Sequence, residues 1–163
     1  MFSIGDKVVH PMHGAGIIDG VVTEKIGMSS QDYYVFKMPV GGLVLKIPVA
    51  SSHLVGLRNI VDVATATELI AAISHMDVDM TSNWNRRYRE NMERLKSGNL
   101  YEVARVIKGL SYRDNERGLS NGERKMLHTA KQILISEMVL VMGQEYQIVE
   151  QRINSAMSGD MAG

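Results

Sequence analysis

Residues 81–91 read TSNWNRRYREN and contain Trp84, the only tryptophan of the 163-residue chain. The first three side chains carry oxygens that can accept hydrogen bonds from the free N–H groups of a first helical turn. The stretch therefore predicts a helix that begins here, with Trp84 in its first turn and near solvent. Because residues three and four apart share a helix face, Trp84, Arg87 and Asn91 should project together.

The aromatic and basic side chains of this stretch allow two interpretations. Guanidinium groups neutralise phosphates, and an aromatic side chain can fill the space where a base pair unstacks at the edge of a duplex, so the face suits nucleic acid. Alternatively, Trp84 anchors the core and the arginines form a solvated face. Residue type alone favours the second interpretation, because tryptophan is on average more buried than exposed.

The composition of the whole chain is that of a globular protein. A length of 163 residues with 45% hydrophobic content suits one ordinary domain or two small ones with a packed core. The absence of cysteine excludes disulfides and cysteine-ligated zinc, and it favours a reducing compartment. Neither a secretion signal nor an apolar run long enough to span a membrane is present. We therefore expect a soluble, cytoplasmic protein with no membrane partner.

The net charge of zero hides a local excess of positive charge. Residues 84–131 contain twelve Lys and Arg against six Asp and Glu, whereas residues 132–163 contain one against four. A basic block that starts at Trp84 supports a discrete electrostatic surface, although solvated helices also carry arginine. The charge pattern therefore agrees with a local nucleic-acid contact and not with a generally basic binding protein.

Residues 1–60 have the pattern of a small β-barrel. Short β-branched or aromatic runs are separated by Gly, Pro and Asp, and Gly41-Gly42 has the spacing of a tight hairpin. The runs that we predict as strands are residues 7–10, 16–22, 33–38 and 43–47. This pattern favours a Tudor-like or SH3-like barrel that acts as a binding unit, with edges open to strand addition from a partner.

From about residue 61 the apolar spacing becomes helical. We predict a helical domain of about five helices over residues 61–163, with a frayed tail after about residue 157. The expected helices start at a Thr65 capping box, at residues 81–83, at Asn99, at a Ser120 capping box and near Glu145, and residues 113–118 are expected to form a polar break. The predicted fold is α+β with two domains, residues 1–60 and 61–163.

Other candidate chemistry is weak. His10 and His13 with Asp6 lack the further ligands that a metal site needs, so no metal is expected. The closely spaced glycines at 14, 16 and 20 lie in a β-rich segment and do not open a helix, so they are not a phosphate loop. We expect no cofactor and no enzymatic activity.

Three motifs in fixed order resemble the CarD family, the CarD/CdnL group of bacterial transcription regulators. They are GDKVVHPMHGAG at residues 5–16, TSNWNRRY at 81–88 and RDNERGLSNGERKML at 113–127. The similarity spans about residues 2–142 and is more specific than any one motif. It favours the nucleic-acid interpretation of Trp84 over the core anchor.

The resemblance implies a factor that binds RNA polymerase and promoter DNA. In this family the N-terminal barrel docks on the polymerase β subunit largely through strand edges, and the helical domain contacts the DNA minor groove without sequence specificity at the upstream fork of the open complex. Trp84 corresponds to the family's wedge residue. The residues implied in DNA binding are Trp84, Arg86, Arg87, Arg89, Arg124 and Lys125.

The polymerase contact implied by the resemblance includes Lys46, the family's basic strand residue. Where some members have an arginine late in the second strand, this chain has Glu24 followed by Lys25, so the contact there is expected to be remodelled. A protein–protein adaptor without DNA contact is the alternative function. We expect a monomer in solution, although the open strand edges and the segment 61–80 would permit domain exchange.

Overall fold

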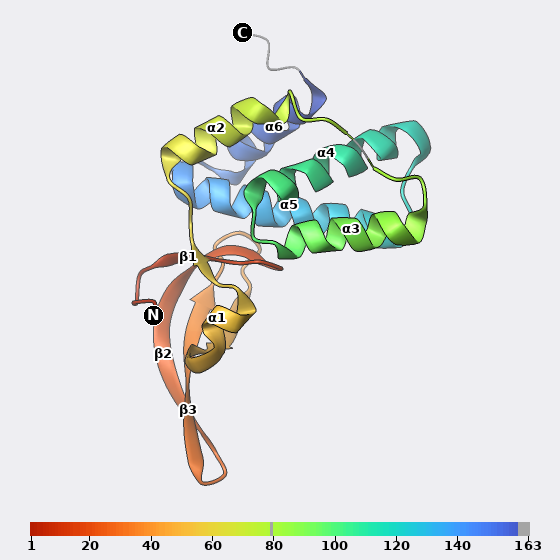
Figure 1. Cartoon of the computed structure of the whole chain (residues 1–163). Helices are drawn as coiled ribbons and strands as arrows, with labels where there is room; N and C mark the ends of the chain where they lie inside the picture. Colours follow the sequence, from red (N-terminus) through yellow and green to blue (C-terminus); the bar gives the residue numbers. More distant parts are fainter. Residues whose placement is uncertain (79, 160–163) are drawn as a thin grey trace.

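The structure is a computed structural model that describes residues 1–78 and 80–159, and it combines an antiparallel sheet with a helical bundle (Figure 1). The strands are β1 Lys7–His10, β2 Gly14–Ile26, β3 Ser29–Lys37, β4 Val44–Pro48 and β5 Arg58–Asn59. The helices are the 3₁₀-helix η1 Val49–Ser51, α1 Ser52–Val55, α2 Val63–Ile73, α3 Trp84–Lys96, α4 Leu100–Arg117, α5 Asn121–Met142 and α6 Tyr146–Ser158. Strands therefore precede helices, as expected for the α+β class.

The sheet has the strand order β4-β3-β2-β1-β5. Gly41 and Gly42, with φ of +86° and +70°, form the predicted turn between β3 and β4. The expected barrel is not closed, because β4 and β5 lie at opposite edges and do not pair. The chain between them is occupied by η1 and the one-turn helix α1, and β5 has only two residues.

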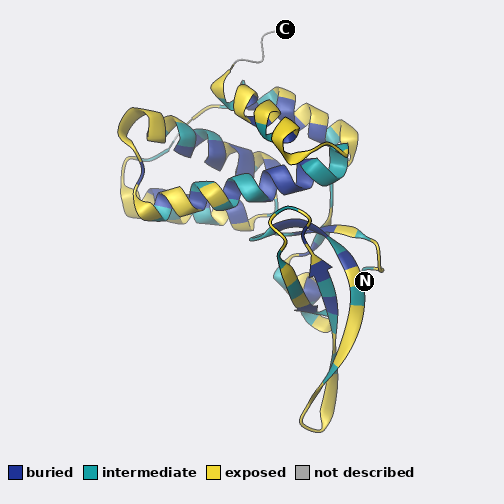
Figure 2. Cartoon of the chain, turned by 180° about the vertical axis from the view of Figure 1, so that it is seen from behind, coloured by how far each residue is buried: buried dark blue, intermediate teal, exposed yellow. Residues whose placement is uncertain are grey.

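Alternation along the strands buries one face of the sheet. Val8, Ile18, Tyr34, Phe36 and Ile47 form its core, all less than 5% exposed. The β2–β3 hairpin extends well beyond this core, as the exposed colours in Figure 2 show. Its distal half therefore presents both faces to solvent.

Helices α2, α3, α4 and α5 begin at a side chain that caps them, whereas α6 has no side-chain cap. Asn83, Asn99 and Ser120 accept hydrogen bonds from backbone N–H groups of α3, α4 and α5, which confirms the predicted starts. Helix α2 begins earlier than expected, because its cap is Asp62 and not Thr65. The described residues contain six α-helices: the five expected after residue 61, and α1, which lies within the strand-rich part and was not expected.

Helix α4 also differs from the prediction at its C-terminal end. It continues through the polar run to Arg117 and ends at Gly118, whose φ is +77°. The polar side chains there face solvent, so they do not interrupt the helix. At the chain end, α6 reaches Ser158 with Gly159 as its cap, and the rest of the expected frayed tail lies outside the described residues.

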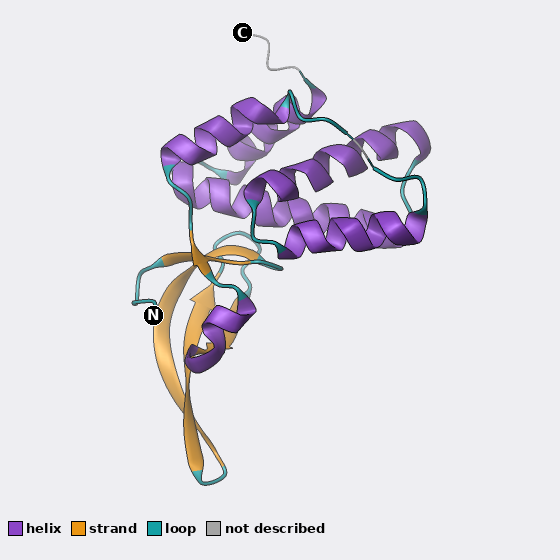
Figure 3. Cartoon of the chain, viewed as in Figure 1, coloured by secondary structure: helices purple, strands orange, loops and turns teal. Residues whose placement is uncertain are grey.

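Helix α5 lies at the centre of the molecule. Its buried side chains, together with those of α4, α2 and α6, form the larger core, which includes Ile107, Leu110, Ile133, Leu134 and Met138. The view by secondary structure shows the sheet packed below this bundle, with the chain crossing from one to the other near β1 and β5 (Figure 3). No helix in the described ranges is long and apolar enough to cross a membrane.

Candidate nucleic-acid interface

The start of α3 places Trp84 at the surface. Asn83 has extended backbone angles, and its side-chain oxygen accepts from the N–H of Arg86 at 3.0 Å. This cap makes Trp84 the first residue of the helix, and 42% of its surface is exposed. The core-anchor interpretation therefore does not describe Trp84.

Trp84 is exposed but held in one orientation. Its ring stacks on Tyr88, with centroids 5.1 Å apart and an interplanar angle of 17°. Its indole N–H donates to the Ser120 hydroxyl oxygen at 3.0 Å, and the same oxygen accepts from the N–H of Glu123 as the cap of α5. Gly122 lies beside both rings, since a Cβ there would be 3.6 Å from each. The indole is therefore positioned by α5 as well as by its own helix.

Arg87 does not lie on the expected outer face. It is 1% exposed, and its Nε and Nη2 groups donate to the Glu123 carboxylate at 2.7 and 3.0 Å. Its Nη1 group donates to the carbonyl oxygens of Thr81 and Ser82, both at 3.1 Å. In this arrangement all three guanidinium nitrogens of Arg87 are engaged, so this side chain is not available to a phosphate. It ties the segment before Trp84 to α5, which is a positioning role.

The other two arginines of the stretch are exposed. Arg86 pairs with Glu90 one helical turn later, at 2.9 Å, and 66% of the Arg86 side chain remains exposed. Arg89 is exposed and makes no hydrogen bond or ion pair with the described residues. Exposed i,i+4 pairs contribute only a few tenths of a kcal/mol, so Arg86 can exchange Glu90 for a phosphate at little loss.

Two basic residues of α5 line a surface groove at the start of this helix. Arg124 and Lys125 are both exposed, and Arg124 Nη2 donates to the carbonyl of Leu119 at 3.2 Å. The groove has a volume of about 620 Å³ and also includes Asn121, His128 and Thr129. Sequence reasoning missed His128, although its position three residues after Lys125 places it on the same helix face.

The residues expected at the polymerase contact lie on the sheet. Lys46 on β4 forms an exposed ion pair with Glu24 on β2 across the intervening strand β3. A hydrogen bond from the Lys46 ammonium to Glu24, together with the charge of that carboxylate, raises the pKa of Lys46. Lys25 is exposed and, by strand alternation, lies on the opposite face from Glu24. The structure therefore brings two of these three residues together.

The histidines that could suggest a metal site lie against each other, with ring centroids of His10 and His13 4.5 Å apart. Burial, and then the charge of His13, lowers the pKa of His10 to about 4. Its neutral Nδ1 accepts a hydrogen bond from the N–H of Met12 at 3.1 Å, which is a local turn contact. The described residues contain no group of three or more His, Asp or Glu side chains that could hold a metal ion.

A buried carboxylate joins the sheet to α5. Glu137, which is 0% exposed, accepts two hydrogen bonds from Arg58 of β5 at 2.9 and 2.7 Å and one from the N–H of Val61 at 2.9 Å. The Arg58 Nε group donates to the carbonyl of Gly98 at 3.0 Å. One guanidinium group therefore connects β5, α5 and the turn between α3 and α4.

A second polar contact lies beside the first. The buried hydroxyl of Ser136 accepts from the N–H of Ala15 on β2 at 2.9 Å, and a Cβ at Gly14 would lie only 2.4 Å from its oxygen. Sequence reasoning missed both junction residues of α5. The signal was present, because Ser136 and Glu137 interrupt an otherwise apolar run from Ile133 to Met138.

Comparison with known proteins agrees with this architecture. Residues 2–61 match the CarD-like/TRCF RID domain, and residues 68–154 match the CarD C-terminal domain. Over 155 residues, the chain is 33% identical to a protein of Bacillus subtilis (strain 168) named "Putative transcription factor YdeB", covering 95% of this chain and 99% of that relative. Domains of this kind are regulatory and not enzymatic. The chain belongs to the CarD family of transcription factors.

Proposed function

We propose that this protein binds the β subunit of RNA polymerase through residues 1–60 and stabilises the promoter open complex through residues 61–163. The observation that carries the proposal is the state of Trp84: 42% exposed, yet held by Tyr88 and Ser120. An exposed aromatic ring with a fixed orientation loses little conformational entropy when it binds. It can therefore act as a preformed wedge at the upstream edge of the bubble, in the minor groove.

The wedge acts by differential affinity and needs no chemical step. A factor shifts the equilibrium between closed and open promoter only by the difference between its affinities for the two states. Stacking of an aromatic side chain on an unpaired base contributes about 1–3 kcal/mol. That difference corresponds to roughly a five- to hundred-fold change in open-complex lifetime if it is fully expressed.

Exposed basic side chains near Trp84 supply the contacts to phosphates. Arg86 and Arg89 on α3 and Arg124 and Lys125 on α5 are all exposed. Such contacts position a protein on the duplex without reading its sequence, which suits a factor that acts at many promoters. Arg87 has a different role in this proposal, because its guanidinium group is buried against Glu123 and supports the wedge from behind.

The open sheet supplies the polymerase tether. Strand β4 is an edge, and an edge strand can add to a sheet of another protein through its free backbone groups. Lys46, Glu24 and Lys25 then set the charge near this edge, and the Lys46–Glu24 pair is exposed enough to be exchanged for partner contacts. Tethering raises the local concentration of the helical part, so its own affinity for DNA can be weak. We infer a cytoplasmic monomer.

The decisive experiment measures promoter open-complex lifetime with the cognate RNA polymerase. We expect wild type to lengthen the lifetime and Trp84→Ala to bind polymerase equally well without lengthening it. Tyr101→Ala is the matched control, because Tyr101 is also an exposed aromatic in the first turn of an Asn-capped helix. It should behave as wild type.

Two outcomes would contradict the proposal. If Trp84→Ala stabilised the open complex as well as wild type, the wedge assignment would be wrong. If wild type bound polymerase but showed no salt-dependent binding to forked DNA, the protein would instead be an adaptor between proteins.

A further inference from the structure

A cavity of about 840 Å³ lies where the sheet meets the bundle. Its walls come from the β3–β4 turn, from α5 and from the first turns of α6. The turn lies close to α5, because a Cβ at Gly41 would be 3.6 Å from the side-chain nitrogen of Gln132. The cavity shares only His128 with the groove that contains Arg124 and Lys125. A molecule bound here would therefore contact both parts of the protein.

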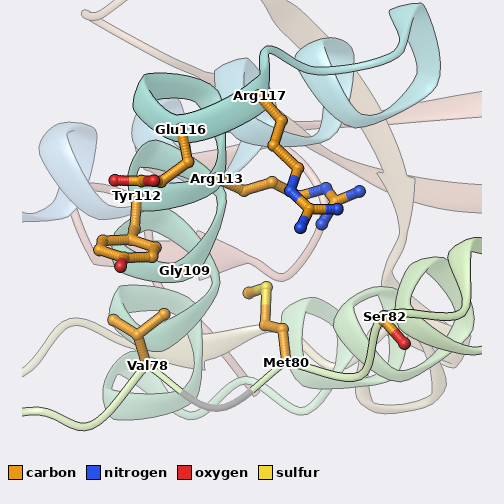
Figure 4. Close-up of a pocket in the computed structure, with 8 residues that line it drawn as sticks. All are labelled: Val78, Met80, Ser82, Gly109, Tyr112, Arg113, Glu116 and Arg117. Carbon is orange, nitrogen blue, oxygen red and sulfur yellow. The ribbon is translucent and has the colours of Figure 1, made fainter.

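This cavity differs from the pocket on α4. That pocket is smaller, about 310 Å³, and the Glu116 side chain lies over Tyr112, its aromatic residue (Figure 4). The cavity at the junction is near the upper end of the range for small-molecule sites, about 300–1,000 Å³. It therefore has room for a ligand with several groups.

The α5 wall of the cavity carries a lysine without a partner. Lys131 is half-buried and makes no hydrogen bond or ion pair with any described residue. The side-chain amide of Gln132, also half-buried, has no hydrogen bond within the described part of the chain. A partly buried ammonium group loses hydration, and a partner of opposite charge compensates this loss. This wall therefore favours a carboxylate.

The α6 wall of the cavity carries a carboxylate, that of the half-buried Glu150. Burial, and then the charge of Glu150 and a hydrogen bond to it, raise the pKa of Tyr146. A carboxylate has two oxygens that accept about four hydrogen bonds, so one hydroxyl leaves it able to bind an ammonium group. Glu150 and Lys131 both line the cavity but form no ion pair with each other.

The remaining lining is largely apolar. It includes Pro39 and Val40 of the β3–β4 turn and Val139 of α5. These side chains favour a ligand with an apolar body. The two opposite charges exclude a ligand with a single charge, because an anion would meet Glu150 and a cation would meet Lys131.

We propose that this cavity binds a zwitterion with an apolar body, which is the chemistry of an apolar amino acid or of a short peptide with free ends. The carboxylate of the ligand pairs with Lys131 and its ammonium group with Glu150, and its apolar side chains contact Val40 and Val139. The inference does not rest on the proposed function, because it uses neither Trp84 nor the edge of the sheet.

Calorimetric titration of the full chain with L-leucine and with the dipeptide leucyl-leucine tests the proposal. Two analogues each lack one charge: N-acetyl-leucyl-leucine has no ammonium group, and leucyl-leucinamide has no carboxylate. We expect each analogue to bind wild type about tenfold more weakly than leucyl-leucine, because one charge-assisted contact is lost. Bound leucyl-leucine should also raise the melting temperature.

Two variants assign the ends of the ligand. Lys131→Gln should weaken leucyl-leucine binding about tenfold and abolish the preference over leucyl-leucinamide. Glu150→Gln should weaken it to a similar extent and abolish the preference over N-acetyl-leucyl-leucine. The controls Lys96→Gln and Glu93→Gln remove exposed charges of α3 and should change neither affinity nor preference. Thermal melting should show all four variants folded.

The two sources are separated by the probe that wild type binds more tightly. Tighter binding of leucine supports a free amino acid, and tighter binding of leucyl-leucine supports the ends of a peptide. The proposal is overturned if neither probe binds, if either singly charged analogue binds as tightly as leucyl-leucine, or if Lys131→Gln and Lys96→Gln bind alike.

Discussion

Two buried ion pairs on α5 differ in how deeply their arginines lie. Glu123, near the start of the helix, binds Arg87, whose side chain is 1% exposed, whereas Glu137 binds Arg58, whose side chain is 27% exposed. The first pair supports the segment that carries Trp84, and the second joins the sheet to the bundle. One helix therefore holds both the sheet and the segment that carries Trp84. Because Arg87 has no access to solvent and Arg58 has some, loss of the carboxylate should cost more at Arg87 than at Arg58.

Removal of Glu123 should have the largest effect. Glu123→Ala leaves the Arg87 guanidinium buried without its carboxylate, so we expect a loss of about 3–5 kcal/mol in the free energy of unfolding. Chemical denaturation with Trp84 fluorescence measures it. Glu93→Ala, an exposed carboxylate on α3, is the control and should stay within about 0.5 kcal/mol of wild type. Equal stability of both variants would show that the buried pair is not needed.

At the junction between the sheet and α5, substitution of Arg58 and substitution of Glu137 should lower the stability by different amounts. Arg58→Ala leaves the fully buried Glu137 carboxylate with one donor, the N–H of Val61. In Glu137→Gln the amide oxygen can still accept from Arg58, and the Arg58 side chain is partly exposed to solvent. We expect Arg58→Ala to lose about 2–4 kcal/mol and Glu137→Gln to lose less. Urea denaturation of both variants compares them. If Glu137→Gln lost more stability than Arg58→Ala, solvent access would not compensate the Arg58 charge after loss of the carboxylate.

A smaller effect is expected where the sheet approaches α5 through Gly14. A Cβ there would be 2.4 Å from the Ser136 hydroxyl, and the backbone φ of +116° disfavours any other residue. Gly14→Ala should lose about 1–3 kcal/mol. Gly5→Ala, with φ of +93° but open space around it, reports the backbone contribution alone. If the two losses, measured by thermal unfolding, were equal, close packing at the junction would not contribute.

Ser120 connects Glu123 of the first ion pair to Trp84. Ser120→Ala removes both the cap of α5 and the acceptor of the Trp84 indole N–H, so we expect a loss of about 1 kcal/mol and a changed Trp84 emission spectrum. Asn99→Ala removes a cap on α4 that does not contact Trp84. It should lower stability to a similar extent and leave the emission unchanged, and a spectral shift in both variants would contradict this assignment.

The smallest effect belongs to an exposed carboxylate. Hydrogen bonds from Thr65, first from its side chain and then from its backbone, lower the pKa of Asp62 below the ordinary value of 3.8. The stabilisation is therefore present above that value and is lost as the pH falls through the lower folded pKa. Wild type should lose more stability than Asp62→Asn between pH 4 and the acid end of the titration. Parallel curves in thermal melts against pH would exclude this contribution.

Local signals in the sequence predicted most of the elements. Capping residues such as Asn83 and Ser120 and apolar spacing located α3, α4 and α5, and β-branched runs located the first four strands. Such features act within one or two helical turns or along one strand, so they are visible without the fold. The exposure of Trp84 followed from its place beside a cap.

Contacts between distant residues were not predicted. Arg87 and Glu123 are 36 residues apart, and Arg58 and Glu137 are 79 apart, so no local pattern assigns them as partners. For this reason Arg87 was expected at the surface with its neighbours. In the structure it is buried and paired with Glu123 of α5. The sequence predicted a barrel with open edges, but strand patterns do not show whether the two edge strands meet, and in the structure β4 and β5 lie at opposite edges of the sheet.

The spacing of Glu123 and Glu137 along α5 fixes the rotation of the Trp84 end of the bundle relative to the sheet. They are fourteen residues apart on one helix, which corresponds to a rise of about 21 Å and nearly four complete turns. A one-residue insertion between them would turn the Trp84 end by about 100° relative to the sheet. In the proposed function, such a rotation would change the direction in which Trp84 meets the DNA relative to the polymerase contact.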